Sequence, residues 1–593
     1  MNEPKIHPFK EQRGVVLVIS LLVLTILSVL GLAFLTTART EDMIASNYRN
    51  HTAAFYAAEA GLESGMASLK VLLATSPTPT VAQLDALAPP ALTDPNYTFV
   101  PNAFQVRRVR TKEPYEYQTS LTSGIYQGLN GLTTDYLITA TVTGPRGSRA
   151  RLTQRVQRLR IPLFQFAAFY GKGVDLEIAP GPAMTLNGRI HSNSNLHLVT
   201  YSNLKIDSFV TTTGDIHRYR KSEPYNWNGT VEIRDAGGSY QALNFEHEYD
   251  YDFQNTWSAA DWKKAALSTF GGRVQDSAMG VQEIIPPIPD ALYDPAKPDV
   301  SSHLMIEKGL PSDTPDLKEA KIYYQADLRI ENGVVKKKDG TPVNLVAQGC
   351  SPQTVTTKTF YDAREQQNMV VTEVNVGMLK DCKQAPANGI LYASGSGPVN
   401  AVRLVNGAEL PGPTAENPNG GLTVVSENPV YIQGDYNTVN KVPAAVMGDA
   451  VTVLSNNWGK DYDKKGKDTP DKRPAAPTTV NAAIATGPSA ESTEKNGNGE
   501  LNNLLRFLED WKGAGTPNVP FNYNGSLVAL WHSEQATKPW RCCGGNPNGV
   551  SPDFEQYYNP PKRDWKYDTL FNTAPPPGTP MGIITMRGQW SEG

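Results

Sequence analysis

Gly14-Val-Val-Leu-Val-Ile-Ser-Leu-Leu-Val-Leu-Thr-Ile-Leu-Ser-Val-Leu-Gly-Leu-Ala-Phe34 is the stretch that decides the fold. No charged residue occurs from Val15 to Leu35. As an α-helix rising about 1.5 Å per residue, this run measures about 30 Å, which matches the hydrocarbon core of a bilayer. The leader before it carries an excess of basic residues, namely Lys5, Lys10 and Arg13. The stretch therefore predicts a membrane-spanning helix with a cytoplasmic amino terminus.

The helical pattern continues beyond the apolar run. Thr36 to Lys70 contains no proline and is rich in alanine and leucine, and Pro77 and Pro79 end the pattern. A secretory signal has a shorter apolar core and a small-residue cleavage site, followed by unrelated sequence. We therefore predict one helix over 15–72, about 85 Å long at the standard rise, rather than a secretory signal.

Three short motifs accompany this helix: the junction Gln12-Arg13-Gly14, Met43-Ile-Ala-Ser-Asn47 and Phe55-Tyr-Ala-Ala-Glu-Ala60. Together they resemble the amino-terminal segment of type IV pilins and pseudopilins, and most closely that of PilX-type minor pilins. The resemblance implies that a prepilin peptidase cleaves after Gly14 and N-methylates Val15. A plain single-pass anchor and an uncleaved signal anchor are the alternatives.

One position departs from the pattern of major pilins. These carry a glutamate at the fifth place after the cut, where it pairs with the new amino terminus of a neighbour. Ile19 stands there in this chain. Because an unpaired ammonium in an apolar filament core is costly, the resemblance implies a rare subunit at a tip or in a priming complex.

The composition points to a large β-rich remainder. The 593 residues include 49 glycines and 45 prolines, and only 19% are charged, which is typical of short strands joined by many turns. A net charge of −4 gives no basic footprint for nucleic-acid binding. Disulfides can form outside the cytoplasm. The candidate cysteines are Cys350 and Cys382, which could close a loop, and the adjacent Cys542 and Cys543, which could pair with each other or with the first two.

We predict an α+β fold in two parts. The first has a leader at 1–14, the membrane and pilin helix at 15–72 and a small antiparallel sheet at 73–162, with a hairpin formed by 136–142 and 150–159. On its second strand, Arg149, Arg151 and Arg155 share one face. That face is either solvated or in contact with an acidic neighbouring subunit.

The second part is mainly β. Short apolar strands stepped by Asn and Gly turns predict a β-solenoid, right-handed, with a β-sandwich as the alternative. We expect a first solenoid block at 163–220, an irregular insertion at 221–400 and a second block at 401–593. Within the second block, apolar spacing predicts a helix over 501–511 that covers an open end of the solenoid, and the Pro-rich tail is expected to form an extended strap.

Candidate sites for chemistry are weak. We expect no metal site, no cofactor and no catalytic residue, because no Gly-x-Ser-x-Gly motif, Walker loop, His-Glu-x-x-His motif or Rossmann fingerprint occurs. The groups considered for a metal ion are His191, His197 and His217, the acidic run Glu246, Glu248, Asp250 and Asp252, and the loop 461–468. A solenoid polysaccharide lyase would need aligned acids, for which Glu427, Asp435 and Asp449 are the candidates. The aromatic residues considered for binding a sugar or a protein are Trp458, Trp531, Trp540, Tyr557 and Tyr558.

The expected function follows from the resemblance. It implies a minor pilin-like subunit at the tip or in the priming complex of a type IV pilus, with the β domain displayed for adhesion or partner binding. The implied partners are other pilins, a prepilin peptidase, the inner membrane and a pilus-tip adhesin. The implied location is the inner membrane before assembly and the pilus or cell surface afterwards. The alternatives are a type II secretion pseudopilin, a membrane-anchored surface adhesin and, less favoured, a carbohydrate-active solenoid enzyme.

Overall fold

The structure is a computed structural model of the chain. It describes residues 13–76, 78–221, 228–244, 248–249, 256–289, 291–397, 399–490, 500–512, 518–540 and 556–593. The described chain forms two compact units. The amino-terminal unit comprises Met1–Tyr115, Thr134–Gln157 and Thr585–Gly593, and the β unit comprises Glu116–Thr133 and Arg158–Ile584. The predicted α+β class is confirmed, because a long apolar helix precedes a large mainly-β part.

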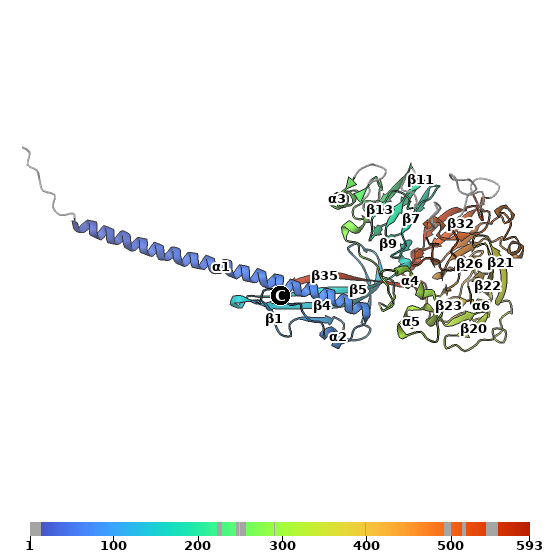
Figure 1. The fold of residues 1–593 in the computed structure, drawn as a ribbon, viewed down its shortest axis with the longest axis horizontal. Helices are drawn as coiled ribbons and strands as arrows, with labels where there is room; N and C mark the ends of the chain where they lie inside the picture. Colours follow the sequence, from blue (N-terminus) through green and yellow to red (C-terminus); the bar gives the residue numbers. More distant parts are fainter. Residues whose placement is uncertain are drawn as a thin grey trace, which may run out of the picture. The chain divides into compact units, whose positions relative to one another are not determined.

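The amino-terminal unit is built on helix α1 (Arg13–Thr75), which Figure 1 shows as one uninterrupted element. Its outer half packs on a sheet through residues spaced three or four apart, as a 3.6-residue period requires. These buried residues are Ala54, Ala58, Leu62, Met66, Leu69 and Leu73. The inward side chains of the sheet that complete this core include Tyr136, Ile138, Ala140, Val142, Leu152 and Val156.

Two glycines let α1 approach the sheet closely. A Cβ atom on Gly61 would lie 2.7 Å from the ring of Phe99 and 3.0 Å from Ala140. A Cβ on Gly65 would lie 2.8 Å from Ile138. Side-chain atoms do not tolerate such distances, so larger residues at either position would force the helix off the sheet.

The sheet contains six strands in the order β1-β4-β5-β35, with β2 and β3 also paired to β4. Their bounds are β1 Thr98–Phe99, β2 Gln105–Arg108, β3 Tyr117–Ser120, β4 Asn130–Thr143, β5 Arg149–Pro162 and β35 Met581–Glu592. Helix α2 (Val81–Asp85) begins with a capping box between Thr80 and Gln83. β35 comes from the far end of the sequence, and the chain ends beside β4 and β5 (Figure 1). The larger segment of the β unit, 158–584, is therefore inserted between two neighbouring strands of the sheet.

The carboxyl-terminal strand also contacts α1. Arg587 forms an ion pair with Glu63, Trp590 packs edge-on against Phe55 at 5.9 Å between ring centroids, and His51 lies 3.3 Å from Glu592. The predicted boundary of the second block at 593 and the extended strap are therefore wrong for residues 585–593. These residues follow a proline-rich run, which conceals the strand in the sequence.

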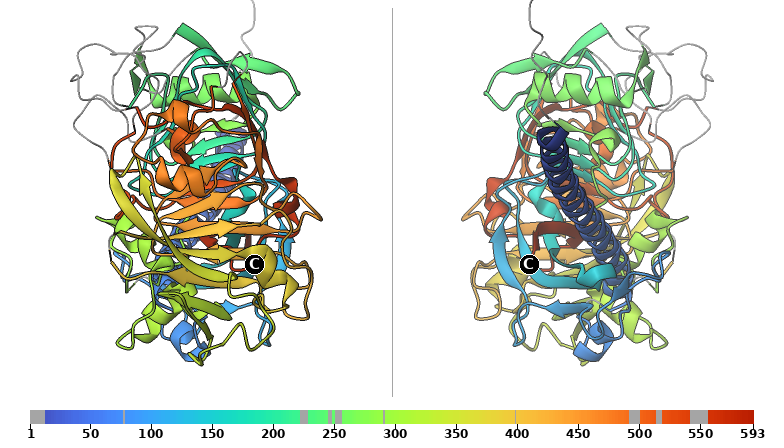
Figure 2. Two further views of the ribbon diagram at one scale, coloured as in Figure 1. Left: turned by 90° about the vertical axis from the view of Figure 1, so that its right-hand side faces the viewer. Right: turned by 90° about the vertical axis from the view of Figure 1, so that its left-hand side faces the viewer.

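The β unit is organised around one eleven-stranded sheet. Its order is β18 (Val274–Gln275), β12 (Val210–Thr212), β9 (Ile190–Ser192), β6 (Ala168–Tyr170), β33 (Leu527–Ala529), β30 (Ala483–Thr486), β27 (Ala444–Gly448), β25 (Leu422–Val425), β23 (Ile390–Ser394), β19 (Leu328–Glu331) and β20 (Val334–Lys337). All neighbours pair in parallel except β19 and β20. Figure 2 shows the strands of the later half, yellow to orange, lying side by side.

Four smaller sheets complete the coils. In two of them, most strands come directly after a strand of the eleven-stranded sheet along the chain. The first contains β21 (Val355–Asp362), β22 (Gln367–Asn375), β24 (Asn400–Val405), β26 (Val430–Gln433), β28 (Val451–Leu454) and β31 (Arg506–Phe507), and the second contains β7 (Leu176–Ile178), β10 (Leu196–Leu198) and β13 (Ile216–His217). In the other two, most strands come before the chain returns to the eleven-stranded sheet. One contains β29 (Thr478–Val480), β32 (Pro520–Gly525) and β34 (Lys562–Tyr567), and the other contains β8 (Met184–Leu186), β11 (Thr200–Ile206), β14 (Asn228–Arg234) and β15 (Tyr240–Ala242).

The chain visits the sheets in a repeating order. From β6 it passes through β7 and β8 and returns at β9, one strand further along the eleven-stranded sheet. The same happens from β27 through β28 and β29 to β30. This is the order that a β-solenoid would have, and both the solenoid and its right-handedness stay predictions. An antiparallel β-sandwich does not have such extended parallel pairing.

The predicted division of this part needs correction. β33 pairs with β6, so the coils of 328–529 and those of 168–275 form one continuous stack rather than two blocks. The stack begins in the middle of the sequence, at β19, within the segment expected to be an irregular insertion. Hydrophobic patterning identifies strands but not the order in which they stack, because parallel neighbours can be far apart in the sequence.

A connecting segment, 276–327, runs from the last strand of the stack back to the first. Its contacts follow the stack from the last coils to the first. The Ile284 N–H donates to Asn193, Asp299 forms a hydrogen bond with His532, and the Ile306 carbonyl accepts from the Tyr392 hydroxyl. Its short helices are α4 (Pro298–His303) and α5 (Pro315–Ala320). The segment is thus fixed along the side of the coils by polar contacts.

The predicted covering helix at 501–511 is wrong. Helix α8 spans only Leu501–Leu504, and Arg506–Phe507 form β31, which pairs with Thr452 and Val453 of β28. The sequence of this segment resembles that of a helix because its apolar residues are buried in the core throughout, and a fully buried run has the same apolar pattern as a helix or as a strand. The helix that joins this core beyond the last coil is α3 (Ala259–Phe270), through Trp262, Ala266 and Phe270.

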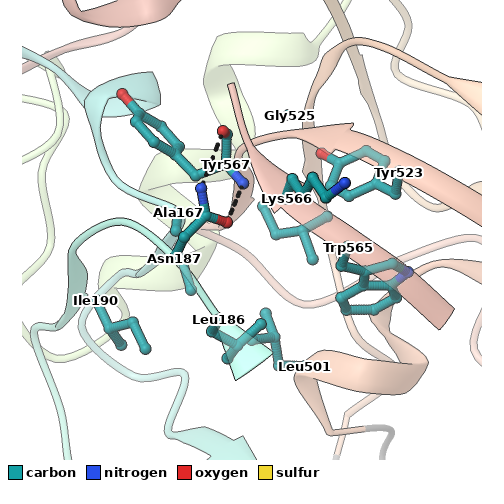
Figure 3. A pocket seen from close by; sticks show the side chains of 12 residues that line it. Ala167, Leu186, Asn187, Ile190, Leu501, Tyr523, Gly525, Trp565, Lys566 and Tyr567 are labelled. Atoms are coloured by element: carbon teal, nitrogen blue, oxygen red, sulfur yellow. Dashed lines mark hydrogen bonds between the residues drawn. The ribbon is translucent and has the colours of Figure 1, made fainter. Parts of the chain in front are cut away.

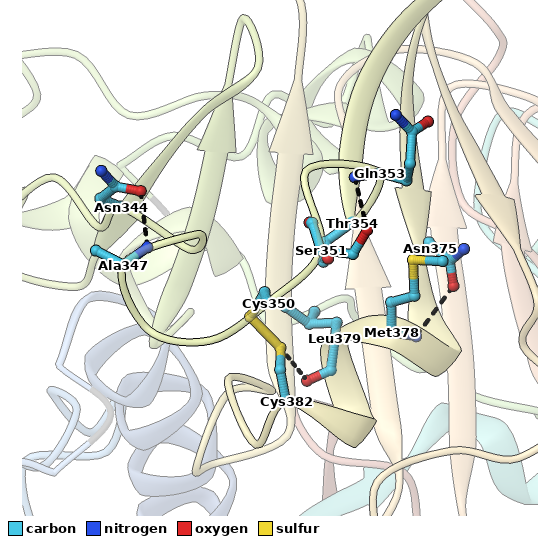
Figure 4. The surroundings of a disulfide bond; sticks show 10 residues. All are labelled: Asn344, Ala347, Cys350, Ser351, Gln353, Thr354, Asn375, Met378, Leu379 and Cys382. Carbon is cyan, nitrogen blue, oxygen red and sulfur yellow. Dashed lines mark hydrogen bonds between the residues drawn. A yellow bond between two sulfur atoms is a disulfide. The ribbon is translucent and has the colours of Figure 1, made fainter.

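A disulfide joins Cys350 to Cys382 and closes a segment that contains β21, β22 and helix α6 (Val376–Asp381) (Figure 4). Cys382 is the carboxyl-terminal cap of α6, and Cys350 is buried. Cys542 and Cys543 lie outside the described residues.

We expect Cys350→Ser/Cys382→Ser to lower the free energy of unfolding of the β unit by about 3–4 kcal/mol, because the 32-residue cross-link restricts the unfolded chain. Thermal unfolding under oxidising conditions, followed by near-ultraviolet circular dichroism, measures the effect. The variant Ser351→Ala is the neighbouring control. Equal melting temperatures for the double variant and the wild type would contradict the prediction.

Candidate functional site

The candidate site is the amino-terminal half of α1. Gly14 and Val15 lie in its first turn, and a Cβ atom on Gly14 would have nothing within 4 Å. The large apolar side chains from Val15 to Leu35 are 47–73% exposed in the structure. One helix, Gly14–Leu73, is long and apolar enough to cross a membrane, with a mean hydropathy of 3.0 in its most apolar window. The apolar surface that the sequence predicted is thus left uncovered by the described residues.

The polar side chains of this apolar segment satisfy themselves. Ser20, Thr25 and Ser28 each donate their hydroxyl to the carbonyl four residues earlier, at 2.6–2.7 Å. A hydroxyl that bonds within its own helix does not have to be desolvated without a partner in lipid or in a packed bundle. The half-helix therefore suits an apolar environment on all sides. Ile19, at the place of the major-pilin glutamate, is 55% exposed on this surface.

Charged residues follow directly below the apolar segment. Arg39, Glu41 and Asp42 are exposed on α1, and so are Met43 and Ile44 of the second motif. On the sheet of the same unit, Arg149 and Arg151 are exposed, whereas Arg155 donates to the buried Asp135 carboxylate at 3.1 Å. The three arginines share one face of β5 and all three are exposed, and Arg155 is in addition paired with Asp135.

The histidines considered for a metal are placed by the coils. His197 and His217 are register partners on β10 and β13, with ring centroids 4.8 Å apart. His191 is fully buried on another sheet, where its two ring nitrogens bond Thr211 and Asn193 at 2.9 Å. Burial lowers the pKa of His191 to about 4. Among the described residues, no group of three or more His, Cys, Asp or Glu side chains is arranged to hold a metal ion.

The other metal candidates separate in the structure. The side chains of the run from Glu246 to Asp252 lie outside the described residues. In the loop 461–468, Asp463 pairs with the buried Arg403 at 2.7 Å and also accepts from the Trp458 indole at 2.9 Å. This carboxylate holds helix α7 (Lys460–Lys464) against the core.

The three acids considered for catalysis support the connecting segment and the turns. Glu427 accepts the Lys308 N–H at 2.9 Å, and Asp435 accepts the Thr479 N–H at 2.8 Å. Asp449 is fully buried and accepts from the backbone of 534–536. His303, 3.6 Å from Asp449, has its pKa raised to about 9 by hydrogen bonds and charges of acidic neighbours, which outweigh its burial. These acids and His303 line neither the small interior void between β8 and β34 nor the open hollow beside Phe209 and Arg273.

The aromatic candidates are packing residues. Trp458, Trp531, Tyr557 and Tyr558 are at most 4% exposed, and Trp540 is half-buried with its indole N–H donating to the Tyr558 hydroxyl. They fill the interior of the coils, where large aromatic side chains contribute most to stability.

One interior void lies between β8 and β34 (Figure 3). Its volume is about 20 Å³, and Leu186, Ile190, Leu501 and Trp565 are among its lining side chains. At its rim, Asn187 accepts the Tyr567 N–H at 2.8 Å. A void of this size admits about one water molecule, so it is a packing defect rather than a ligand site.

Glu509 is a buried carboxylate that sequence patterning did not single out. It accepts the backbone N–H of Ser455 at 2.6 Å and the Ser455 hydroxyl at 2.5 Å. Burial nevertheless raises its pKa to about 7. The group therefore titrates near neutral pH inside the core.

The raised pKa of Glu509 predicts how the stability of the fold depends on pH. Because the pKa of Glu509 is higher in the folded than in the unfolded chain, its contribution is most favourable below about pH 4.5 and is lost as the pH rises through 7, by at most about 3 kcal/mol. We expect Glu509→Gln to flatten the dependence of the melting temperature on pH between 5 and 8. Glu319→Gln, at an exposed glutamate, is the control. An unchanged slope in Glu509→Gln would show that another group is responsible.

Comparison with known proteins places the amino-terminal segment. Residues 13–63 match the PilX N-terminal family model. No curated protein sequence matches the chain. Among solved structures, the chain is similar to the crystal structure of the competence-associated pilin ComZ from Thermus thermophilus, at 10% identity and a TM-score of 0.26, with 92% of this chain and 98% of that chain covered.

The family match covers α1 from Arg13 to Glu63. The amino-terminal segment is thus similar to that of PilX-type minor pilins, and a large additional domain follows it. The match includes the motifs Met43–Asn47 and Phe55–Ala60 and the exposed apolar segment from Val15 to Leu35.

Proposed function

We propose that this protein is a minor pilin-like subunit of a type IV pilus, located at the tip or in a priming complex. The observation that carries the proposal is the PilX N-terminal match at 13–63, which falls on a helix whose apolar half is fully exposed. That half first spans the inner membrane, with the amino terminus in the cytoplasm, and then packs among the helices of other pilins. The role is assembly and display, without catalysis.

A prepilin peptidase is proposed to cleave after Gly14 and to methylate Val15. The position of the peptide bond supports this, because it lies at the exposed start of α1, where no other part of the described chain covers it. In the filament, the exposed Arg149 and Arg151 are proposed to face acidic residues of a neighbouring subunit. The new ammonium has no glutamate beside it at position 19, which supports a rare position over a repeating one.

The β unit supports a terminal position through its size. It contains most of the chain, and its larger segment, 158–584, runs between two strands of the sheet, β5 and β35. A subunit of this bulk repeating along a thin filament would crowd its neighbours, whereas at a tip it has room. We propose that it displays a surface for adhesion or for a pilus-tip adhesin.

The amino-terminal mass of the protein tests the proposal. It is measured on the chain recovered from sheared surface filaments and, separately, from membranes. We expect N-methylated Val15 in the filament fraction. A terminus at Met1 found only in membranes would overturn the proposal and leave a membrane-anchored surface protein.

A further inference from the structure

An open hollow of about 610 Å³ lies in the β unit beside the last coils. Its volume is within the range of ligand-binding sites. Four stretches of the sequence contribute to it, and its lining residues are Gly124, Ile125, Gln127, Gly128, Phe209, Ala236, Gly271, Gly272, Arg273 and Gln275. We call it the coil-end groove.

The stacking of the coils creates one wall of the groove. Arg189, Phe209 and Arg273 each stand one residue before a strand, and Ile190, Val210 and Val274 after them are register partners on β9, β12 and β18. The three side chains therefore form a ladder along the stack. The guanidinium carbons of Arg189 and Arg273 lie 4.0 Å and 5.5 Å from the centroid of the Phe209 ring.

The two arginines have different tasks. Arg189 is buried and fixes the opposite rim, because it donates to the carbonyls of Ile125 (at 3.0 Å) and Gln127. Arg273 is half-buried, and the bond from one of its terminal nitrogens to the Asp207 carbonyl at 3.2 Å anchors it in the wall. Its guanidinium is the charged group that the groove presents.

The charge of the groove is one-sided. Its lining contains Arg273 and no carboxylate. Asp207, whose backbone carbonyl accepts from Arg273, has its side chain engaged by the Tyr240 hydroxyl. Burial, with a further contribution from the charge of Arg273, lowers the pKa of Arg189 to about 10. Two neighbouring guanidinium groups without a facing carboxylate attract an anion.

The neutral lining is suited to hydroxyl groups. Gln127 is exposed at the rim, and Gln275 is half-buried and donates one amide hydrogen to the Gly272 carbonyl at 2.6 Å. Amide side chains offer donors and acceptors together. Gly128 and Gly272 have φ values of +90° and +83°, and a Cβ on either would meet nothing within 4 Å, so their backbone is open to a ligand.

We propose that the coil-end groove binds a segment of an acidic saccharide, with Arg273 pairing with its carboxylate and Gln127 and Gln275 bonding its hydroxyls. The idea that this saccharide is the target of a displayed domain rests on the proposed function. The binding of the saccharide by the groove does not. A nucleic acid is disfavoured, because its dense phosphates call for several free cations and the groove presents one.

The test uses the full chain purified in a nonionic detergent. Binding of trigalacturonate is measured by isothermal titration calorimetry at low ionic strength, beside neutral galactotriose, sodium phosphate and an oligothymidylate. We expect trigalacturonate to bind, and Arg273→Gln to weaken it about tenfold or more through loss of a charge-assisted bond. Lys337→Gln, which removes an exposed charge on β20, is the matched control and should bind as the wild type does.

A second variant guards against misfolding. Gln127→Glu changes an exposed rim residue and places a carboxylate against the anion, so it should also weaken binding about tenfold, with an unchanged melting temperature. The proposal would be overturned if both groove variants bound trigalacturonate as tightly as the wild type, if galactotriose bound as tightly as trigalacturonate, or if the wild type did not bind. The same would follow if phosphate or the oligothymidylate bound as tightly as the saccharide. Filament incorporation of Arg273→Gln is scored separately, so that failure of the groove and failure of the assembly role are distinguished.

Discussion

A chain carrying Gly14→Val is expected to keep its leader and to be missing from surface filaments. The peptidase has to accommodate the residue before the cut in its own active site, and a branched side chain there obstructs the peptide bond. The helix itself tolerates the change, because a Cβ at Gly14 meets nothing within 4 Å and valine has a higher helix propensity than glycine. We expect processing to fall at least about a hundredfold, which corresponds to roughly 3 kcal/mol of lost transition-state binding.

The chain offers a matched control for this variant. Gly31 lies in the same apolar helix, and a Cβ there also has nothing within 4 Å. Gly31→Val should therefore be processed as the wild type is. Intact mass of the membrane and filament fractions is the measurement. Normal processing of Gly14→Val, or equal losses in both variants, would contradict cleavage after Gly14.

Removal of residues 585–593 is expected to destabilise the amino-terminal unit by about 3–6 kcal/mol, since backbone hydrogen bonds contribute roughly 1 kcal/mol each and an edge strand with its cross-strand pairs is lost. The deletion removes the Gly593 N–H bond to Arg151, the bond from Gln154 to the Gly588 carbonyl and the packing of Trp590 on Phe55. Hydrogen exchange of the β5 amides at 149–157 should accelerate strongly, while the β unit keeps its melting temperature.

A point variant separates the strand from its surface charge. Arg587→Gln breaks the ion pair with Glu63 but leaves β35 in place. Because both side chains are 53% exposed, this loss should cost less than about 1 kcal/mol. If the deletion and Arg587→Gln were equally mild, β35 would not be a structural part of the sheet.

The helix and the class of the β part were predictable because their signals are local. A charge-free run, absence of proline and alanine-rich spacing identify α1 within two or three residues of its bounds, Arg13–Thr75. Asn and Gly turns between short apolar runs identify strands. The segment 501–511 was misread because a fully buried apolar run looks alike as helix and as strand.

The stack order and the groove were not predictable. Nothing local in Leu527–Ala529 states that it pairs with Ala168–Tyr170, more than half the chain away. Arg189, Phe209 and Arg273 become a ladder only through the register of the coils, and 124–128 joins them through bonds from Arg189. Likewise, nothing in the sequence of β35 indicates that it pairs with β5.

The sequence by itself determined the long apolar helix and the β-rich character of the remainder, since these depend on hydrophobicity, chain stiffness and turn residues read along the chain. The tertiary structure alone decided that residues 158–584 are inserted between β5 and β35, that the coils start at β19, and that an arginine-bearing groove lies beside the last coils. These features depend on pairings between distant segments, whose free energy comes from burying shared surface and from completing hydrogen bonds, and no single segment records its partner.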